Sequence, residues 1–129
     1  MKDKLNKLLK RAHGTYSGVQ VAAIVLTNAG NFSGVNVENA AYPSSMCAER
    51  NAIFNAVTEG MKVGGLKEVH LTSNLKKKNL FPCAGCLQVM LEFMPATGQV
   101  HMYHKNEILV HELRELIPYG VTVESFEWK

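Results

Sequence analysis

The three cysteines of this 129-residue chain lie in two short motifs whose spacing suits a metal ion. Cys83 and Cys86 are one helical turn apart, so both sulfurs can reach the same ion. Cys47 can supply a third thiolate from another helix. Three protein ligands leave the fourth tetrahedral position of Zn²⁺ open for water, which is the arrangement of a catalytic zinc site. The sequence therefore predicts zinc bound by Cys47, Cys83 and Cys86.

Two residues that follow Cys47 could support chemistry at such an ion. Zinc lowers the pKa of a bound water, and a carboxylate beside that water can carry its protons. Glu49, two residues after Cys47, can take this place without binding the metal. Three thiolates around Zn²⁺ leave a net negative charge, which helix N-termini would stabilise. Arg50 is expected to donate to the ligand sulfurs and to offset the same charge.

Strands and helices that alternate along the chain are predicted to position these motifs. The apolar, β-branched segment 19–27 predicts a strand buried on both faces, followed by a turn at 28–31. Ser44 or Ser45 is expected to cap the helix that carries Glu49. The predicted strands cover 19–27, 32–36, 68–73, 99–104 and 107–110, and the predicted helices cover 3–12, 46–59, 84–94 and 111–117. This order suits one α/β domain over residues 1–129, with a five-stranded mixed sheet and helices on both faces.

Composition and charge indicate an ordinary globular protein. Hydrophobic residues make up 47% of the chain, but no apolar run reaches the roughly 18 residues of a membrane span. Residues 1–11 lack the apolar core of a signal peptide, so we predict a cytoplasmic protein without membrane contact. The net charge is only +3, and the Lys-rich segments 2–11 and 76–78 are expected to be solvated surface and not a nucleic-acid interface.

The motifs also occur together in a known family. Nearly the whole chain resembles the small homotetrameric zinc-dependent cytidine deaminases, which carry the three-cysteine form of the zinc-deaminase signature. The resemblance implies a three-layer α/β/α fold and active sites completed by neighbouring subunits of a homotetramer. It also implies hydrolysis of free cytidine and deoxycytidine to uridine and deoxyuridine. It rests on Tyr16-Ser17, 36–42, 47–50, 82–86 and Gln88-Val89.

The same resemblance implies a role for each site residue. Zinc hydroxide would attack C4 of the pyrimidine, and Glu49 would take the water proton, pass it to N3 and later protonate the leaving amine. Asn36 and Glu38 would bind the ribose 3′-hydroxyl, and the backbone N–H of Ala48 would bind the base carbonyl. If the chain is extended at 36–38, the side chains of Asn36 and Glu38 point the same way.

Several positions depart from the family pattern. Val19 and Val121 stand where the family has phenylalanine, Ala22 where it has glycine, and Leu87 where it has arginine. None of these is a predicted metal ligand, so the reaction type stands. The smaller valines predict a roomier base pocket unless another ring fills the gap. Three aromatic residues near Val121 are candidates for this, in the same or a neighbouring subunit: Tyr119, Phe126 and Trp128.

Other interpretations of the cysteines remain open. The Cys83/Cys86 pair is also typical of a structural zinc knuckle, with His70 or His101 as fourth ligand, or of a redox dithiol. Neither alternative gives Glu49 a role. The five histidines are otherwise predicted to be surface or strand residues and not ligands.

Three further alternatives concern function. A non-catalytic zinc module would need the cysteines but not Glu49. A polynucleotide deaminase would bring a 3′-phosphate against Glu38, whose charge would repel it. A deaminase of a blasticidin S-like nucleoside antibiotic would share the cysteine site, but Asn36 and Glu38 favour a ribose.

Overall fold

The computed structural model describes residues 1–126. Strands and helices alternate along these residues in the predicted order. The strands are β1 (Val21–Thr27), β2 (Gly30–Val35), β3 (Leu66–Ser73), β4 (Gln99–His104) and β5 (Glu107–Glu112). The helices are α1 (Lys2–Leu9), α2 (Ala48–Thr58), α3 (Ala84–Phe93) and α4 (Leu113–Leu116), and 3₁₀ turns lie at Tyr42–Ser44 and Val123–Ser125.

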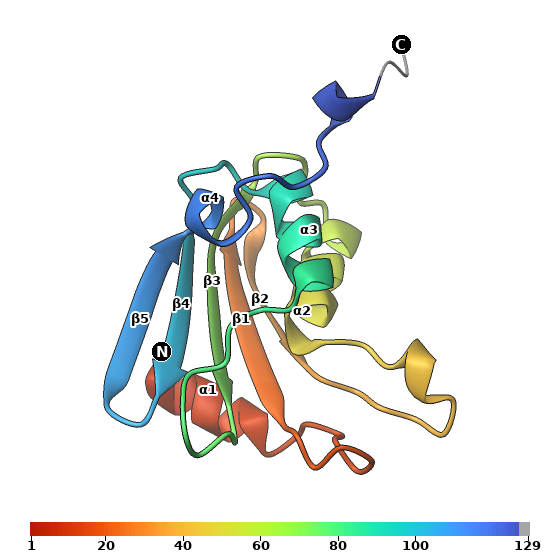
Figure 1. The fold of residues 1–129 in the computed structure, drawn as a ribbon, viewed down its shortest axis with the longest axis vertical. Helices are drawn as coiled ribbons and strands as arrows, with labels where there is room; N and C mark the ends of the chain where they lie inside the picture. The colour runs from red at the N-terminus through yellow and green to blue at the C-terminus, as the bar shows by residue number, and fades with distance from the viewer. Residues whose placement is uncertain (127–129) are drawn as a thin grey trace.

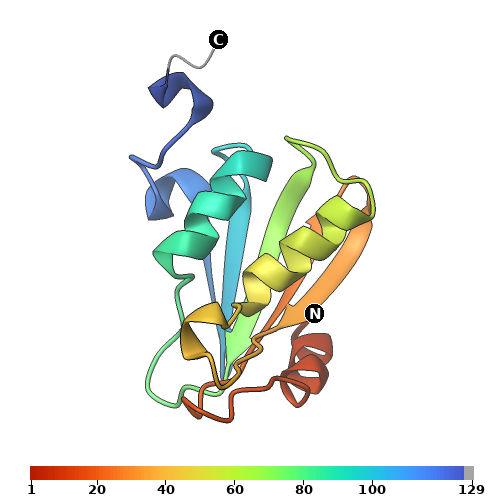
Figure 2. The ribbon, with the colours of Figure 1, turned by 90° about the vertical axis from the view of Figure 1, so that its right-hand side faces the viewer.

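The five strands form one mixed sheet in the order β2-β1-β3-β4-β5. β3 and β4 are parallel, and the other neighbouring strands are antiparallel. α1 covers part of one face, whereas α2 and α3 lie side by side on the other face (Figures 1 and 2). The predicted three-layer α/β/α fold with a five-stranded mixed sheet is confirmed. Within residues 1–126, no helix is long and apolar enough to cross a membrane.

β1 is the centre of two hydrophobic cores because both of its faces are covered. Val21, Ala23 and Val25 pack into the larger core beneath α2 and α3. Ala22 and Ile24 face the opposite way, into a smaller core beneath α1. The predicted double-sided burial of this strand is confirmed, and the larger core is the layer on which the metal-binding motifs rest.

The start of α2 differs from the prediction. Its N-cap is Cys47, and neither Ser44 nor Ser45 caps it. The two serines instead close the preceding 3₁₀ turn through backbone hydrogen bonds. Met46 then pairs with Val37 as an antiparallel bridge, which keeps the chain extended up to Cys47. The cysteine is therefore delivered directly to the N-terminus of the helix.

Other element ends shift by a few residues. α1 ends at Leu9 and not at residue 12, and β1 begins at Val21 and not at residue 19. β5 continues to Glu112, because Glu112 still pairs with Gln99 of β4. A capping box between Glu112 and Glu115 then starts α4, so the last helix begins two residues later than predicted.

Candidate active site

The three predicted zinc ligands meet where α2 and α3 begin. Cys47 and Cys83 are the N-cap residues of the two helices, and Cys86 lies in the first turn of α3. The Sγ atoms of Cys47 and Cys83 are 3.8 Å apart, and those of Cys83 and Cys86 are 3.5 Å apart. Zn–S bonds of about 2.3 Å in tetrahedral geometry place sulfurs about 3.8 Å apart. The donor set and its spacing therefore fit a zinc ion.

Arg50 and the helix N-termini favour thiolate at this site. Arg50 Nη2 donates to the Sγ of Cys47 over 3.3 Å. Hydrogen bonds from Cys86 and from Arg50 lower the pKa of Cys47 to about 5, against the opposing effect of burial. The shared contact with Cys47, together with burial, raises the pKa of Cys86. The surroundings of the cluster thus favour thiolate at Cys47.

Glu49 lies in the first turn of α2, with only 3% of its surface exposed. Its Oε2 atom is 3.7 Å from the Cys86 Sγ, so the carboxyl group lies against the metal ligands. Burial raises the pKa of Glu49, which brings the group closer to the range useful for proton transfer near neutral pH.

A cavity of about 330 Å³ opens directly onto Cys47, Cys83 and Glu49. This volume lies at the lower end of the range for small-molecule sites. A larger hollow of about 600 Å³ lies between residues 77–81 and the β4–β5 turn, but none of the predicted site residues lines it. The lining of the smaller cavity comprises Ser17, Val19, Val21, Asn36, Glu38, Tyr42, Ser45, Met46, Cys47, Ala48, Glu49, Leu80, Phe81 and Cys83.

Asn36 and Glu38 both line this cavity although β2 ends one residue before Asn36. Both are buried, whereas Val37 between them is exposed, so the alternation of an extended chain continues. Asn36 Oδ1 accepts the Val21 N–H over 2.8 Å, and Asn36 Nδ2 donates to the Val19 carbonyl over 2.8 Å. One amide hydrogen and one oxygen lone pair of Asn36 are left for a ligand.

Glu38 is held by the loop that precedes β1. Its Oε1 accepts the N–H groups of Tyr16 and Ser17 at 3.1 and 2.9 Å, and its Oε2 accepts the Ser17 hydroxyl at 2.5 Å. These bonds, the Ser17 hydroxyl first, hold the pKa of Glu38 below its ordinary value. The carboxylate is thus ionised and oriented, and it keeps about one of its four lone-pair positions for a ligand.

Ala48 is the first residue of α2, and it is fully buried at the cavity wall. The first four N–H groups of an α-helix have no partner within the helix. The Ala48 N–H is one of these four groups, so it is placed to bind an acceptor atom of a ligand.

The structure adds lining residues to which the sequence analysis gave no role in the site. Phe81 and Tyr42 bring two aromatic rings to the cavity. Ser45 also lines it, and the buried hydroxyl oxygen of this residue has no hydrogen-bond partner within the described part of the chain. Each of the three lies within two residues of a motif, since Phe81 precedes Pro82 and Ser45 precedes Cys47 by two. That adjacency is the signal by which they could have been found.

The departures from the family pattern fall in different places. Val19 lines the cavity, whereas Leu87 packs against the larger core. The C-terminal segment runs away from the start of α2 and α3 (Figure 2). Val121 is held there by the Gln88 side chain, which bonds both its backbone N–H and its carbonyl, at 3.0 and 2.7 Å. Tyr119 and Phe126 are likewise not among the cavity residues, and Trp128 lies outside the described residues.

The histidines suggested as a fourth ligand lie elsewhere. Val69 and Leu71 of β3 enter the core beneath α2 and α3, so His70 between them projects from the opposite face of the sheet. His101 stacks on His70 there. Neither histidine joins the cysteines, so the predicted structural alternative with these ligands is not formed.

Comparison with known proteins places the chain in a family. Residues 1–102 match the family model of the cytidine and deoxycytidylate deaminase zinc-binding region. A cytidine deaminase of Mycoplasma genitalium is 39% identical over 70% of this chain and 68% of that protein. One from Halalkalibacterium halodurans is 35% identical over 88% of this chain and 86% of that protein. The chain belongs to this family of zinc-binding deaminases, which confirms the predicted family and the zinc cofactor.

A solved structure extends the likeness to the whole fold. The crystal structure of a cytidine deaminase from Burkholderia pseudomallei has a TM-score of 0.85 and 30% sequence identity to this chain. The likeness covers 92% of this chain and 94% of that one. The α/β fold described above is therefore the fold of cytidine deaminases.

Proposed function

We propose that the protein catalyses the hydrolytic deamination of free cytidine and deoxycytidine to uridine and deoxyuridine. One observation carries the proposal: a single cavity joins the cysteine cluster and Glu49 to the buried polar pair Asn36 and Glu38. Reactive groups at one part of a cavity and hydroxyl-binding groups at another are what a nucleoside with a reacting base requires. The cytidine deaminases that resemble this chain support the same substrate.

Glu49 is the proposed proton carrier. When bound, zinc supplies a Lewis acid that lowers the pKa of a coordinated water. Glu49 accepts a proton from the attacking water and delivers it to N3 of the ring. It then carries a second proton, from the new hydroxyl group on C4, to the exocyclic nitrogen, so that the C4–N bond breaks and ammonia leaves as the C4 carbonyl forms. Its burial, and the raised pKa that follows, suit a group that must both accept and return a proton. The Ala48 N–H binds the base carbonyl.

Asn36 and Glu38 bind the sugar in this proposal. The spare donor of Asn36 and the spare lone pair of Glu38 match a hydroxyl group, which both donates and accepts. A ribose 3′-phosphate would meet the ionised Glu38 carboxylate and be repelled. The same charge makes the nucleoside preferred over a polynucleotide, and no nucleic-acid partner is proposed.

The test compares deamination rates for a panel of free and linked cytosines. Purified zinc-loaded protein is incubated with cytidine, deoxycytidine, cytosine, CMP, a single-stranded oligonucleotide and blasticidin S. We expect turnover of the two nucleosides and little of the others. Preferential turnover of blasticidin S or of the oligonucleotide would replace the proposed substrate, and no turnover of any would favour a non-catalytic zinc module.

A matched pair of variants tests the mechanism. Glu49→Gln should keep its zinc and fold but lose activity, by about 10²–10⁴-fold for each proton transfer it serves. Glu59→Gln, at the other end of α2 and exposed, should behave as the parent protein. Near-normal turnover of zinc-loaded Glu49→Gln would refute Glu49 as the proton carrier.

Assembly and location are part of the proposal. We propose a homotetramer, supported by exposed apolar side chains on the projecting C-terminal segment, among them Tyr119, Val121 and Val123 (Figure 1). Light scattering should give four chains per particle, and a fully active monomer would refute this. We also propose a cytoplasmic location, because a reducing compartment keeps thiol ligands available for metal.

A further inference from the structure

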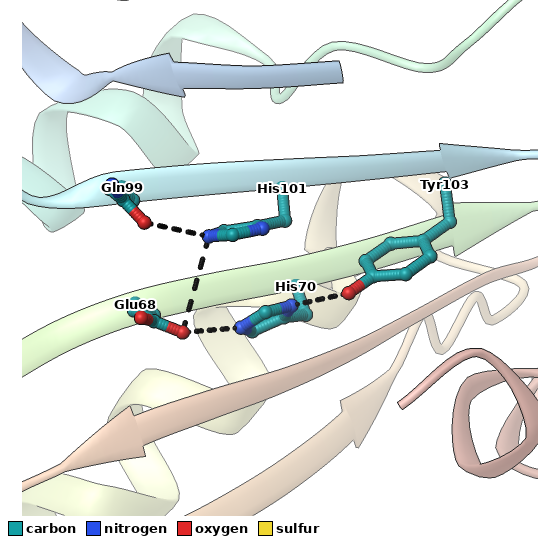
Figure 3. Close-up of polar contacts among 5 residues, drawn as sticks. All are labelled: Glu68, His70, Gln99, His101 and Tyr103. Atoms are coloured by element: carbon teal, nitrogen blue, oxygen red, sulfur yellow. Dashed lines mark hydrogen bonds and ion pairs between the residues drawn. The ribbon is translucent and has the colours of Figure 1, made fainter. Parts of the chain in front are cut away.

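A second group of metal-binding side chains lies on the sheet face opposite the cysteines. β3 and β4 are parallel neighbours, and their register sets His70 directly beside His101 and Glu68 beside Gln99. Figure 3 shows Glu68, His70 and His101 directed toward a common point above these two strands. Each offers one ligand atom, and the three atoms lie within 4.8 Å of one another.

We propose that Glu68, His70 and His101 form a second Zn²⁺ site, separate from the cysteine site. Glu68 Oε2 is 2.8 Å from His70 Nε2 and 4.0 Å from His101 Nε2. Zn–N and Zn–O bonds of about 2.0–2.1 Å in tetrahedral geometry require ligand atoms about 3.3 Å apart. The two observed spacings bracket this value, so small side-chain rotations bring all three atoms onto one ion.

The surroundings of His70 are those of a metal ligand. Its Nδ1 is 2.9 Å from the hydroxyl of Tyr103, so an Nδ1–H that donates to this oxygen leaves a lone pair on Nε2, and an ion would replace the present 2.8 Å contact of Nε2 with Glu68. Histidine ligands commonly have such a partner on the second ring nitrogen, because it fixes the tautomer and the ring orientation. His70 and Tyr103 are buried, whereas Glu68 is only half-buried and gives an ion access from solvent.

His101 is prepared for the same role. Its ring stacks on that of His70, with centroids 4.2 Å apart. His101 Nε2 is 3.1 Å from Gln99 Oε1, a contact that an ion would replace. The released Gln99 oxygen or a water can then complete four-coordination.

The donor set distinguishes the two sites chemically. Two imidazoles and one carboxylate suit zinc, cobalt, nickel and copper, whereas three thiolates favour softer metal ions. Cobalt at the cysteine site gives thiolate-to-metal charge-transfer absorption, which nitrogen and oxygen ligands do not give. The second site does not depend on the proposed reaction, so its failure would leave that reaction untouched.

The experiment counts zinc in the full-length protein after equilibrium dialysis against buffered free Zn²⁺. We expect two zinc ions per chain in the parent protein and one in His101→Gln and in Glu68→Gln. His104→Gln, on the same strand but outside the cluster, should keep two. Tyr103→Phe should weaken the second site about 10–100-fold, as loss of such a supporting contact commonly does.

The remaining ion is identified with cobalt. The His101→Gln and Glu68→Gln proteins should keep the charge-transfer band of the cysteine site, which also shows that they are folded. Cys83→Ser should lose that band and keep the second ion. One zinc per chain in the parent protein, or two in both His101→Gln and Glu68→Gln, would overturn the proposal.

Discussion

Arg50 Nη2 lies 3.3 Å from the Sγ of Cys47, the residue that caps the helix on which Arg50 stands. The guanidinium also lies over Gly85, where a Cβ would be 3.6 Å from it. A positive charge is thus held against the cysteine cluster from within α2. Leu87 packs into the core at the position where the family resemblance places a second cation. Arg50 is therefore placed where the charge compensation that we propose for it would act.

Replacing Arg50 tests this compensation. Arg50→Ala should lower zinc affinity by about 10–100-fold, since it removes a charged donor to a ligand sulfur. Arg50→Lys keeps the charge without the planar donor group, so its zinc affinity should lie between that of the parent protein and that of Arg50→Ala. Competition with a chelator measures the affinities. Equal zinc affinity in all three proteins would mean that Arg50 does not contribute to metal binding.

Gly34 is predicted to be essential for the contact between β2 and α2. A Cβ at this position would lie 2.5 Å from the Ala48 carbonyl oxygen and 2.6 Å from the Ala52 backbone nitrogen. Backbone atoms cannot rotate away, so Gly34→Ala should push α2 outward and lower the free energy of unfolding by about 1–3 kcal/mol. Urea denaturation measures the change, and Ser33→Ala on the opposite face of β2 is the control. A loss no larger than that of Ser33→Ala would contradict the close contact.

The bond between Ser17 and Glu38 predicts a pH effect. It lowers the folded-state pKa of Glu38, so its stabilising contribution is present above the unfolded pKa of about 4.3. The contribution is lost as pH falls through the folded-state pKa. Ser17→Ala should therefore raise the pKa of Glu38, and its stability should differ from the parent near neutral pH and converge with it in acid. NMR titration of the carboxyl carbon measures the pKa.

Ser45→Ala is the control for that titration. It removes a hydroxyl from a residue that lines the same cavity, and this oxygen has no hydrogen-bond partner within residues 1–126. The pKa of Glu38 should be the same as in the parent protein. If Ser17→Ala and Ser45→Ala give equal values, the Ser17 hydroxyl is not the cause of the shift.

The fourth prediction concerns Val19 in the cavity wall. Val19→Phe should lower the KM for cytidine about 2–10-fold, because one aromatic contact is worth about 0.5–1.5 kcal/mol. It should also narrow tolerance for cytidines enlarged at C5. Val63→Phe, at an exposed position outside the cavity lining, is the matched control. An unchanged KM with unchanged tolerance would show that Phe81 and Tyr42 already supply the needed ring contacts.

Much of the fold followed from the sequence because its signals are local. The double-sided apolar run of β1 is one example, and the helix predicted over 84–94, observed as α3 at Ala84–Phe93, is another. The predicted cap of α2 was wrong. Serine is a strong capping residue, but the bridge between Met46 and Val37 keeps the chain extended, so the helix begins after Cys47. Pairing with a distant segment overrode a local preference.

Some contacts of the two sites could be predicted from the sequence, and others could not. Cys83 and Cys86 share one turn of helix, so their proximity is readable from spacing alone. His70 and His101 are brought together only by the parallel register of β3 and β4, which no short-range pattern records. Phe81 joins the cavity through the path of the chain before α3. Contacts within a few residues were predictable from spacing, and the meeting of Cys47 with Cys83 and Cys86 was predictable from shared metal chemistry. The contacts that strand pairing and chain path create at His70, His101 and Phe81 were not.

The position of Cys47 and Cys83 as caps of two different helices makes the metal a cross-link as well as a reagent. The two cysteines are 36 positions apart in the chain, and the segment between them contains all of α2 and β3. A covalent bridge that closes a loop of this length stabilises a protein by about 4 kcal/mol, because it restricts the unfolded chain. Metal clips that close long loops act in the same way. Removal of the metal by a chelator would therefore remove a cross-link between two helices together with the reactive centre. Activity and stability against unfolding should then be lost together.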